Sequence, residues 1–264
     1  MVILKNEIKQ IKKITIIWSL ILSFLIIIAL PVYIDMVTGG SISIGNNSNN
    51  AFFETIGTSM EVLTTPIGMY SFLTFFTLVA FSIYGMNLGL GIMTKEYKQN
   101  SADFLMTKPY SRTTIYFSKM MVAALSIVII GLFYIIVSFI AMKLSIDEGF
   151  SLLAVFLISL PIILIPLMFL FFGMLVGTIF PKIRTTIIIS TGVVFLSYAN
   201  GSVSRIAGID ALRYLSPLHY FNDTFVIINN MYEFRFVLVF IIVCLAFILC
   251  GHRIFQKKDI AIVS

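Results

Sequence analysis

The sequence predicts an all-α integral membrane protein with six transmembrane helices, and three observations lead to this fold class. Of the 264 residues, 59% are hydrophobic and 11% are charged, whereas a soluble domain averages about 25% charged residues. The mean hydropathy is +1.04. Six separate segments are long and apolar enough to cross a hydrocarbon core about 30 Å thick, which takes roughly 20 helical residues. Lipid is therefore expected to cover most of the surface, because a soluble fold exposing so many apolar side chains would aggregate.

The six predicted spans form a single transmembrane domain over residues 1–264. They comprise residues 14–34, 67–93, 114–142, 151–179, 186–204 and 235–251. The first is expected to be retained rather than cleaved as a secretory signal, since no A-x-A pattern follows it. The fifth is the weakest, because serine, threonine and asparagine residues dilute its apolar character. An even number of spans places both termini on the same side of the membrane.

The residues before the first span have an amphipathic pattern. Leu4, Ile8 and Ile11 recur at helical spacing, and a lysine follows each of them. This pattern predicts an N-terminal interfacial helix with its apolar stripe in the bilayer and its lysines toward anionic lipid headgroups. The alternative is a short basic flank that needs no helix.

The distribution of charge predicts which side of the membrane each loop occupies. Fourteen of the eighteen Lys and Arg residues lie in the N-terminal segment, loops 94–119 and 180–185, and the C-terminal tail, whereas eight of the twelve acidic residues lie on the other side. Because basic loops stay inside, a multi-pass protein of the cell membrane with both termini in the cytoplasm is predicted. The net charge of +6 does not indicate nucleic acid, since the basic residues flank apolar segments. The two cysteines, Cys244 and Cys250, share one apolar run and predict neither a disulfide nor a metal site.

The last external connection, residues 205–234, is long and semi-apolar. It predicts short, semi-buried extracellular helices before the sixth span. Such backbone is tolerated at membrane depth only where protein or a water-lined cavity surrounds it.

No catalytic or metal-binding pattern occurs in the sequence. The spans carry no charge at their centres, and H-E-x-x-H, G-x-S-x-G and P-loop patterns are absent. Neither histidine has a catalytic partner, and His219 is interpreted as an interfacial side chain. We therefore expect no catalytic residue, metal site or cofactor on this chain, which makes a membrane enzyme the least favoured class.

Small residues and prolines mark points where the spans pack or bend. Two Gly-x-x-x-Gly patterns occur, Gly85 with Gly89 in the second span and Gly173 with Gly177 in the fourth. This spacing lets helices approach closely, either within the chain or between two subunits. In the fourth span, Pro161 and Pro166 each remove a backbone hydrogen bond and are expected to bend the helix, as a static kink or as a hinge.

The most polar run of the chain contains a short predicted helix at residues 101–107, SADFLMT. Asn100 or Ser101 can cap its start, Asp103 favours the first turn, and Pro109 disfavours helix at the residue before it. Its exposed apolar residues are Phe104, Leu105 and Met106. A short apolar-faced helix outside the membrane, flanked by charge, is typical of a segment that docks into a groove of a partner.

The stretch KEYKQNSADFLMTKPYSRTTIYFSK, residues 95–119, resembles the signature loop of ABC-2-type transporter permeases. That loop has an acidic residue, a Gly-Thr-like pair, a Leu-rich turn, Pro-x-Ser-Arg, an apolar residue and lysine. The matching positions are Glu96, Ser101, Phe104, Leu105, Pro109, Ser111, Arg112, Ile115 and Lys119, with Asn100 in place of the usual glycine. The resemblance extends to the layout of nearly the whole chain, and Ser111 is also expected to cap the third span.

The resemblance implies a permease that pairs with a second permease copy or a paralogue and with two cytoplasmic ABC ATPase subunits. Those ATPases would bind ATP and Mg²⁺. Loop 94–113 would be the coupling helix seated in an ATPase cleft, and Lys182 and Arg184 of FPKIRT would form the smaller second contact.

The substrate expectation comes from the lining that the spans can offer. Charge-free spans rich in Phe, Ile and Met favour export of a hydrophobic or amphipathic substrate. Similar exporters of amphipathic peptides or toxins and lantibiotic-immunity transporters in Gram-positive bacteria make peptide export the first expectation. Drug or sodium efflux is the alternative, and a membrane scaffold or sensor without a transport path is the other class left open.

Overall fold

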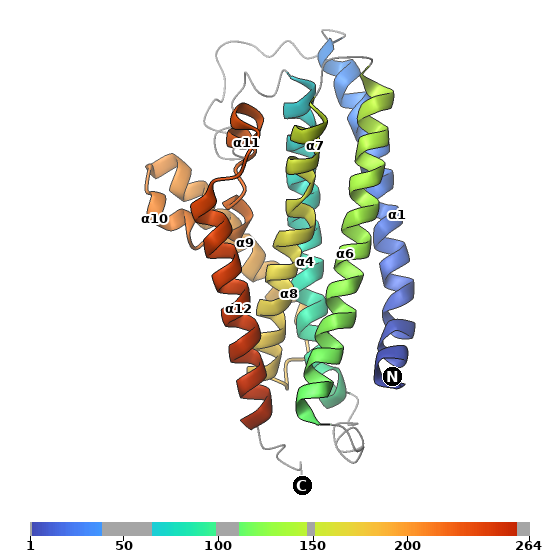
Figure 1. Ribbon diagram of the computed structural model, residues 1–264, viewed down its shortest axis with the longest axis vertical. Helices are drawn as coiled ribbons and strands as arrows, with labels where there is room; N and C mark the ends of the chain where they lie inside the picture. Colours follow the sequence, from blue (N-terminus) through green and yellow to red (C-terminus); the bar gives the residue numbers. More distant parts are fainter. Residues whose placement is uncertain (1, 39–64, 99–110, 147–150, 258–264) are drawn as a thin grey trace.

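The computed structural model describes residues 2–38, 65–98, 111–146 and 151–257, and in this part of the chain every regular element is a helix (Figure 1). All six predicted spans are present as long apolar helices, which confirms the fold class. In chain order the elements are α1 (Val2–Thr38), α4 (Pro66–Lys98), α6 (Arg112–Ser145), α7 (Leu152–Ser159), α8 (Pro161–Ile179), α9 (Thr186–Ala207), α10 (Asp210–Arg213), η1 (Pro217–His219), α11 (Asp223–Asn229) and α12 (Phe234–Lys257).

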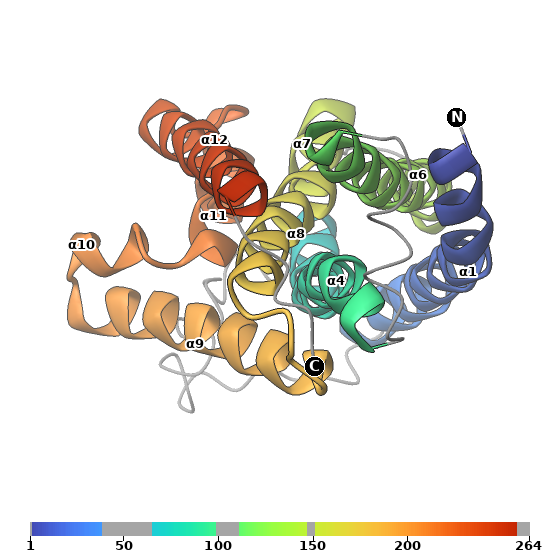
Figure 2. The same cartoon turned by 90° about the horizontal axis from the view of Figure 1, so that it is seen from below.

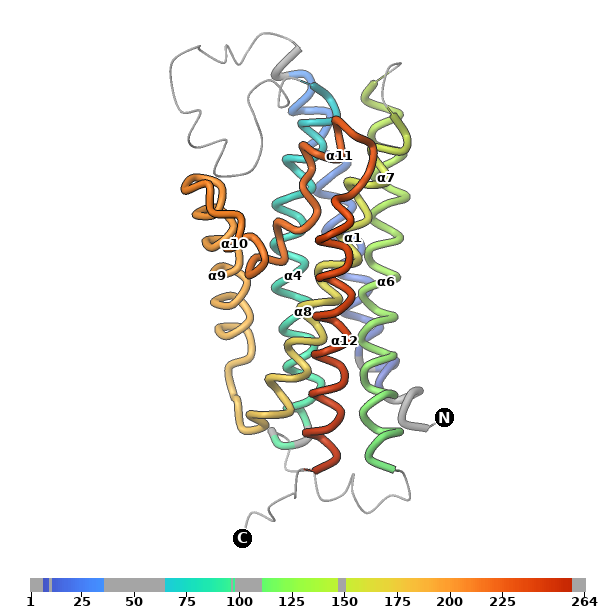
Figure 3. Tube along the Cα trace, turned by 60° about the vertical axis from the view of Figure 1, so that its left-hand side comes forward, coloured from blue at the N-terminus to red at the C-terminus, as the bar shows by residue number. Residues whose placement is uncertain are grey.

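Helices α4 and α8 occupy the centre of the bundle, with α1 and α6 on one side and α9 and α12 on the other (Figure 2). The start of α1, the end of α4, the start of α6, the α8–α9 connection and the end of α12 all lie at the same end (Figure 3). This agrees with an even number of crossings. We call this end the basic end, because it carries most of the described cations.

Helix α1 differs from the expectation of a separate interfacial helix. It runs without a break from Val2 to Thr38 and therefore includes both the amphipathic segment and the first span. The physical reason is that the sequence has neither glycine nor proline before Pro31. Ile11 of the apolar stripe is buried against the bundle, whereas Ile8 remains exposed.

The fourth span is interrupted at Pro161, which divides it into α7 and α8. Leu160 keeps helical dihedral angles, so the two helices continue one another. Pro161 has no N–H to donate to the carbonyl of Leu157 four residues earlier. The hydroxyl of Tyr232, which lies just before α12, donates a hydrogen bond to that carbonyl instead. Pro166, by contrast, lies inside α8 without ending it.

Replacing Tyr232 with phenylalanine is expected to destabilise the folded protein at the point where Pro161 interrupts the fourth span. The substitution removes the donor and leaves the Leu157 carbonyl without this partner, which costs about 1–2 kcal/mol. We expect the apparent Tm in detergent to fall by roughly 2–6 °C. Tyr214→Phe, at an exposed tyrosine of the same segment between α9 and α12, is the matched control and should change Tm by less than about 1 °C. Equal effects of the two substitutions would argue against the hydrogen bond as a support for this span.

The glycine patterns of the second and fourth spans face one another. A Cβ atom added at Gly85 would lie 2.5 Å from the carbonyl oxygen of Pro166, and one at Gly89 would overlap the carbonyl of Leu170. From the opposite helix, a Cβ at Gly173 would overlap the carbonyl of Met86, and one at Gly177 would lie 3.0 Å from the Cβ of Met93. The four glycines thus bring the backbones of α4 and α8 into contact within the chain.

The segment between α9 and α12, which we call the external segment after its predicted side of the membrane, folds back onto the bundle. Helix α9 ends at Gly208 in the left-handed region, φ 66°, and the short elements α10, η1 and α11 follow. His219 is fully buried rather than interfacial, since Gly201 leaves the space that its ring occupies. Its Nδ1 lies 2.8 Å from the Ser216 hydroxyl. Burial, together with the charges of two arginines, lowers the pKa of His219 to about 3, so the ring is neutral in the physiological range.

Lowering the pH is expected to strengthen the contact between α11 and α4. Asp223 accepts a hydrogen bond from the Ser71 hydroxyl at 2.7 Å. Burial raises the pKa of its carboxyl from 3.8 to about 6, although the hydrogen bond and the charge of Arg205 oppose the shift. Because the folded state holds the proton more tightly, the contribution to stability is complete below pH 3.8 and is lost as the pH rises through about 6. The apparent Tm should fall over this range in the native chain but less in Asp223→Asn; identical pH profiles would contradict the assignment.

Candidate functional site

The basic end of the bundle is the candidate functional site. Its described cations are Lys9, Lys12, Lys13, Lys95, Arg112, Lys119, Lys182, Arg184, Arg253 and Lys257. They come from the starts of α1 and α6, the ends of α4 and α12, and the turn between α8 and α9. Both loops that the sequence predicts to couple to a partner leave the bundle at this end.

Much of the predicted coupling segment falls outside the described residues. This holds for Asn100, Ser101, Asp103, Phe104, Leu105, Met106 and Pro109, and for the side chain of Glu96. The backbone of Glu96 belongs to the last turn of α4, and Ser111 and Arg112 begin α6. The structure therefore shows how the two ends of this loop are held.

The start of α6 is fastened to the end of α12. The Ser111 hydroxyl accepts a hydrogen bond from the backbone N–H of Thr114 at 3.1 Å, which is the predicted cap. Arg112 Nη1 donates to the backbone carbonyl of Gln256 at 2.9 Å, and Gln256 Nε2 donates to the Thr113 hydroxyl at 2.9 Å. A displacement of the loop at this point would thus act on both helices.

The end of α4 is held by two lysines. The buried Lys119 of α6 donates from Nζ to the backbone carbonyl of Ile92 at 2.8 Å. Lys95 forms an ion pair with Glu7 of α1 at 3.0 Å. These contacts join α1, α4 and α6 within the last two turns of α4 before the loop.

The second predicted contact, residues 180–185, is a compact turn. The N–H of Ile183 donates to the carbonyl of Phe180 at 3.3 Å, and the side chains of Lys182 and Arg184 are exposed. The turn leaves α8, which the glycine contact joins to α4. Both loops are therefore connected to the same central helix pair.

A cavity of about 620 Å³ lies between α1, α4 and α9 beside these contacts. Glu7 and Lys95 form part of its lining, and Trp18 and Tyr84 form an aromatic wall with ring centroids 4.8 Å apart. The amide of Asn87 adds a polar group whose oxygen has no hydrogen-bond partner among the described residues. The lining is thus aromatic in the membrane and charged toward the basic end.

The sequence interpretation missed the contacts that hold this end together. Glu7 is the only acidic residue among the first 34 and lies in a run of lysines, which was a signal for an ion pair. Lys119 was recognised as part of the loop pattern, but its backbone partner was not. The link between α6 and α12 uses a carbonyl and an amide, which leave no pattern in the sequence.

Comparison with known proteins gives one family match. Residues 1–260 match the family model described as "ABC-2 family transporter protein". No curated protein matches the chain.

Proposed function

The chain belongs to the ABC-2 family of transporter proteins. We propose that it is the permease of an ABC transporter that exports a hydrophobic or amphipathic substrate, first of all amphipathic peptides or toxins. ATP hydrolysis takes place in separate ATPase subunits of the transporter. The family match over residues 1–260 supports the permease role, because it covers both predicted coupling loops and all six spans.

The proposed orientation places the basic end in the cytoplasm of the cell. Support comes from the cations gathered there, which basic-inside topology assigns to the cytoplasmic side. Both termini then face the cytoplasm, where two ATPase subunits have access to loops 94–113 and 180–185. A second permease copy or a paralogue completes the transporter, and the exposed apolar faces of the outer helices meet membrane lipid.

The proposed coupling runs through the central helix pair. Binding and release of ATP move the ATPases and, with them, the segment that contains Phe104, Leu105 and Met106. Because Lys95 and Lys119 hold the end of α4, this movement passes to α1 and α6 as well. The close backbone contact of α4 with α8 extends it to the turn 180–185. Rigid displacement of packed helices is a common form of such transitions.

The cavity between α1, α4 and α9 is the proposed access site for the substrate. Its aromatic wall suits an apolar surface, and Glu7, Lys95 and Asn87 provide polar contacts toward the basic end. A lining with both properties fits an amphipathic molecule better than an ion or a sugar. Helix α9 forms one wall and belongs to the outer part of the bundle, so its displacement would open the cavity (Figure 2).

Co-purification with an ABC ATPase tests the proposed function. A neighbouring reading frame should encode an ATPase with Walker A and ABC signature motifs, and the two proteins should purify together in detergent. Its ATP hydrolysis should rise with amphipathic peptides rather than with drugs or sodium ions. If the chain binds a partner but ATP hydrolysis is never stimulated, the result would favour the alternative function as a membrane scaffold or sensor.

A further inference from the structure

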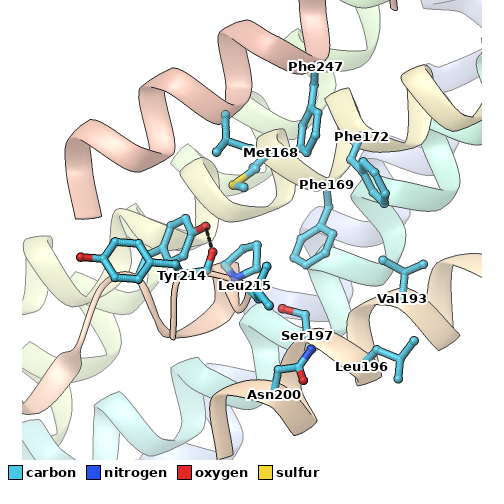
Figure 4. Close-up of a pocket in the computed structure, with 13 residues that line it drawn as sticks. Met168, Phe169, Phe172, Val193, Leu196, Ser197, Asn200, Tyr214, Leu215 and Phe247 are labelled. Atoms are coloured by element: carbon cyan, nitrogen blue, oxygen red, sulfur yellow. Dashed lines mark hydrogen bonds between the residues drawn. The ribbon is translucent and has the colours of Figure 1, made fainter. Parts of the chain in front are cut away.

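A second hollow lies farther along α9 than the 620 Å³ cavity and shares no lining residue with it. It is a crevice of about 430 Å³ between α8, α9, α12 and the external segment (Figure 4). Phe169 and Phe172 of α8 and Phe247 of α12 form one wall, and Leu215 and Pro217 of the external segment close another. Among the residues that the structure describes, no Asp, Glu, Lys or Arg lines it.

The polarity of the crevice changes along α9. Val193 and Leu196 are apolar, whereas Ser197 and Asn200 follow toward the end of the helix where the external segment begins. Ser197 is only 5% exposed, and its hydroxyl has no hydrogen-bond partner among the described residues. A buried hydroxyl without a partner is costly, so this group indicates a ligand with a hydrogen-bonding atom. The backbone carbonyl of Ser197, in contrast, accepts a hydrogen bond from the Ser216 hydroxyl at 2.5 Å, and this bond fixes the external segment beside the crevice.

The rim of the crevice is apolar and exposed, as expected for a mouth that opens toward the bilayer. Leu196 and Leu215 at its rim are each 66% exposed, and the walls belong to helices that span the membrane. The volume falls in the range of about 300–1,000 Å³ that ligand pockets occupy. The molecules that surround such a mouth are lipids, whose chains match the aromatic and aliphatic walls.

We propose that this crevice binds one acyl chain of a membrane phospholipid, with the ester group at Ser197 and Asn200. The chain terminus lies against Phe169, Phe172 and Phe247. The charged headgroup stays outside, because the described lining offers no charged partner. The bound chain fills the space under the external segment and holds that segment against α9.

Tryptophan fluorescence tests the proposal, because the chain has a single tryptophan, Trp18. In a Trp18→Phe background, Phe247→Trp places the fluorophore in the crevice, and Phe133→Trp places it on the exposed face of α6 as the matched control. The full chain in detergent is titrated with phosphatidylcholine brominated in its acyl chains. The crevice tryptophan should be quenched saturably at about one lipid per chain, and the control should show only a weak, non-saturating decline.

A substitution that fills the crevice gives a second test, in which the same saturable quenching is measured. Val193→Phe should weaken the saturable quenching at least about fivefold, whereas Ile129→Phe, the same kind of enlargement on the exposed face of α6, should leave it unchanged. If Val193→Phe does not fold, the lipid titration of the two tryptophan variants still tests the proposal. Equal, non-saturating quenching at both positions would overturn the proposal. Saturable quenching by a brominated single-chain amphiphile but not by the phospholipid would also overturn it.

Discussion

Replacing Gly89 with leucine is expected to prevent stable assembly of the transmembrane bundle. A single Cβ atom at this position already overlaps the Leu170 carbonyl of α8, and a leucine side chain adds three further carbons. Overpacking of side chains alone costs about 1–3 kcal/mol, and here the obstacle is backbone, so we expect a loss of more than about 3 kcal/mol. Size-exclusion chromatography and thermal unfolding in detergent measure the effect.

The same helix supplies a matched control for this substitution. A Cβ atom at Gly91 meets no atom within 4 Å, so Gly91→Leu should give a monodisperse protein with an unchanged or higher Tm. Similar behaviour of the two leucine variants would show that the glycine contact between α4 and α8 does not determine stability.

Deleting residues 101–107 is expected to abolish substrate-stimulated ATP hydrolysis by the transporter while the chain still inserts into the membrane. The proposed docking residues Phe104, Leu105 and Met106 are then absent, so movement of the ATPases no longer reaches α4 and α6. Replacing the segment with seven Gly and Ser residues keeps the loop length and should have the same effect. Arg112→Ala should reduce the stimulation as well, since Arg112 joins the end of the loop to α12.

Normal transport by the deletion variant would contradict the coupling role of the loop. Membrane insertion and co-purification of the proposed second permease copy serve as controls, because we expect neither to depend on the docking segment. Glu96→Gln provides a milder test of the same loop.

The lengths of the apolar runs were sufficient to predict six spans, because crossing a bilayer imposes a minimum helix length. Local chemistry also predicted the Ser111 cap, which depends on residues only three positions apart. The continuity of α1 was missed, because the change from amphipathic to apolar pattern was interpreted as the boundary of a helix. Nothing in residues 2–30 breaks a helix, so the pattern changes while the helix continues.

Contacts between distant residues could not be predicted in the same way. The glycine patterns identified small helix faces, but they did not identify which faces pair. The Tyr232 hydroxyl binds a carbonyl 75 residues away, and only the fold places the two together. The coupling segment itself, residues 101–107, lies outside the described residues and stays a prediction.

The central claim is that this permease couples ATP hydrolysis by a separate ATPase to the export of an amphipathic substrate. The most direct measurement reconstitutes the chain with its ABC ATPase in liposomes and follows ATP hydrolysis and peptide movement together. We predict that amphipathic peptides stimulate hydrolysis, that they cross the membrane only with ATP, and that the 101–107 deletion removes both effects. A rate of ATP hydrolysis that is changed neither by the peptide nor by the deletion would contradict the account.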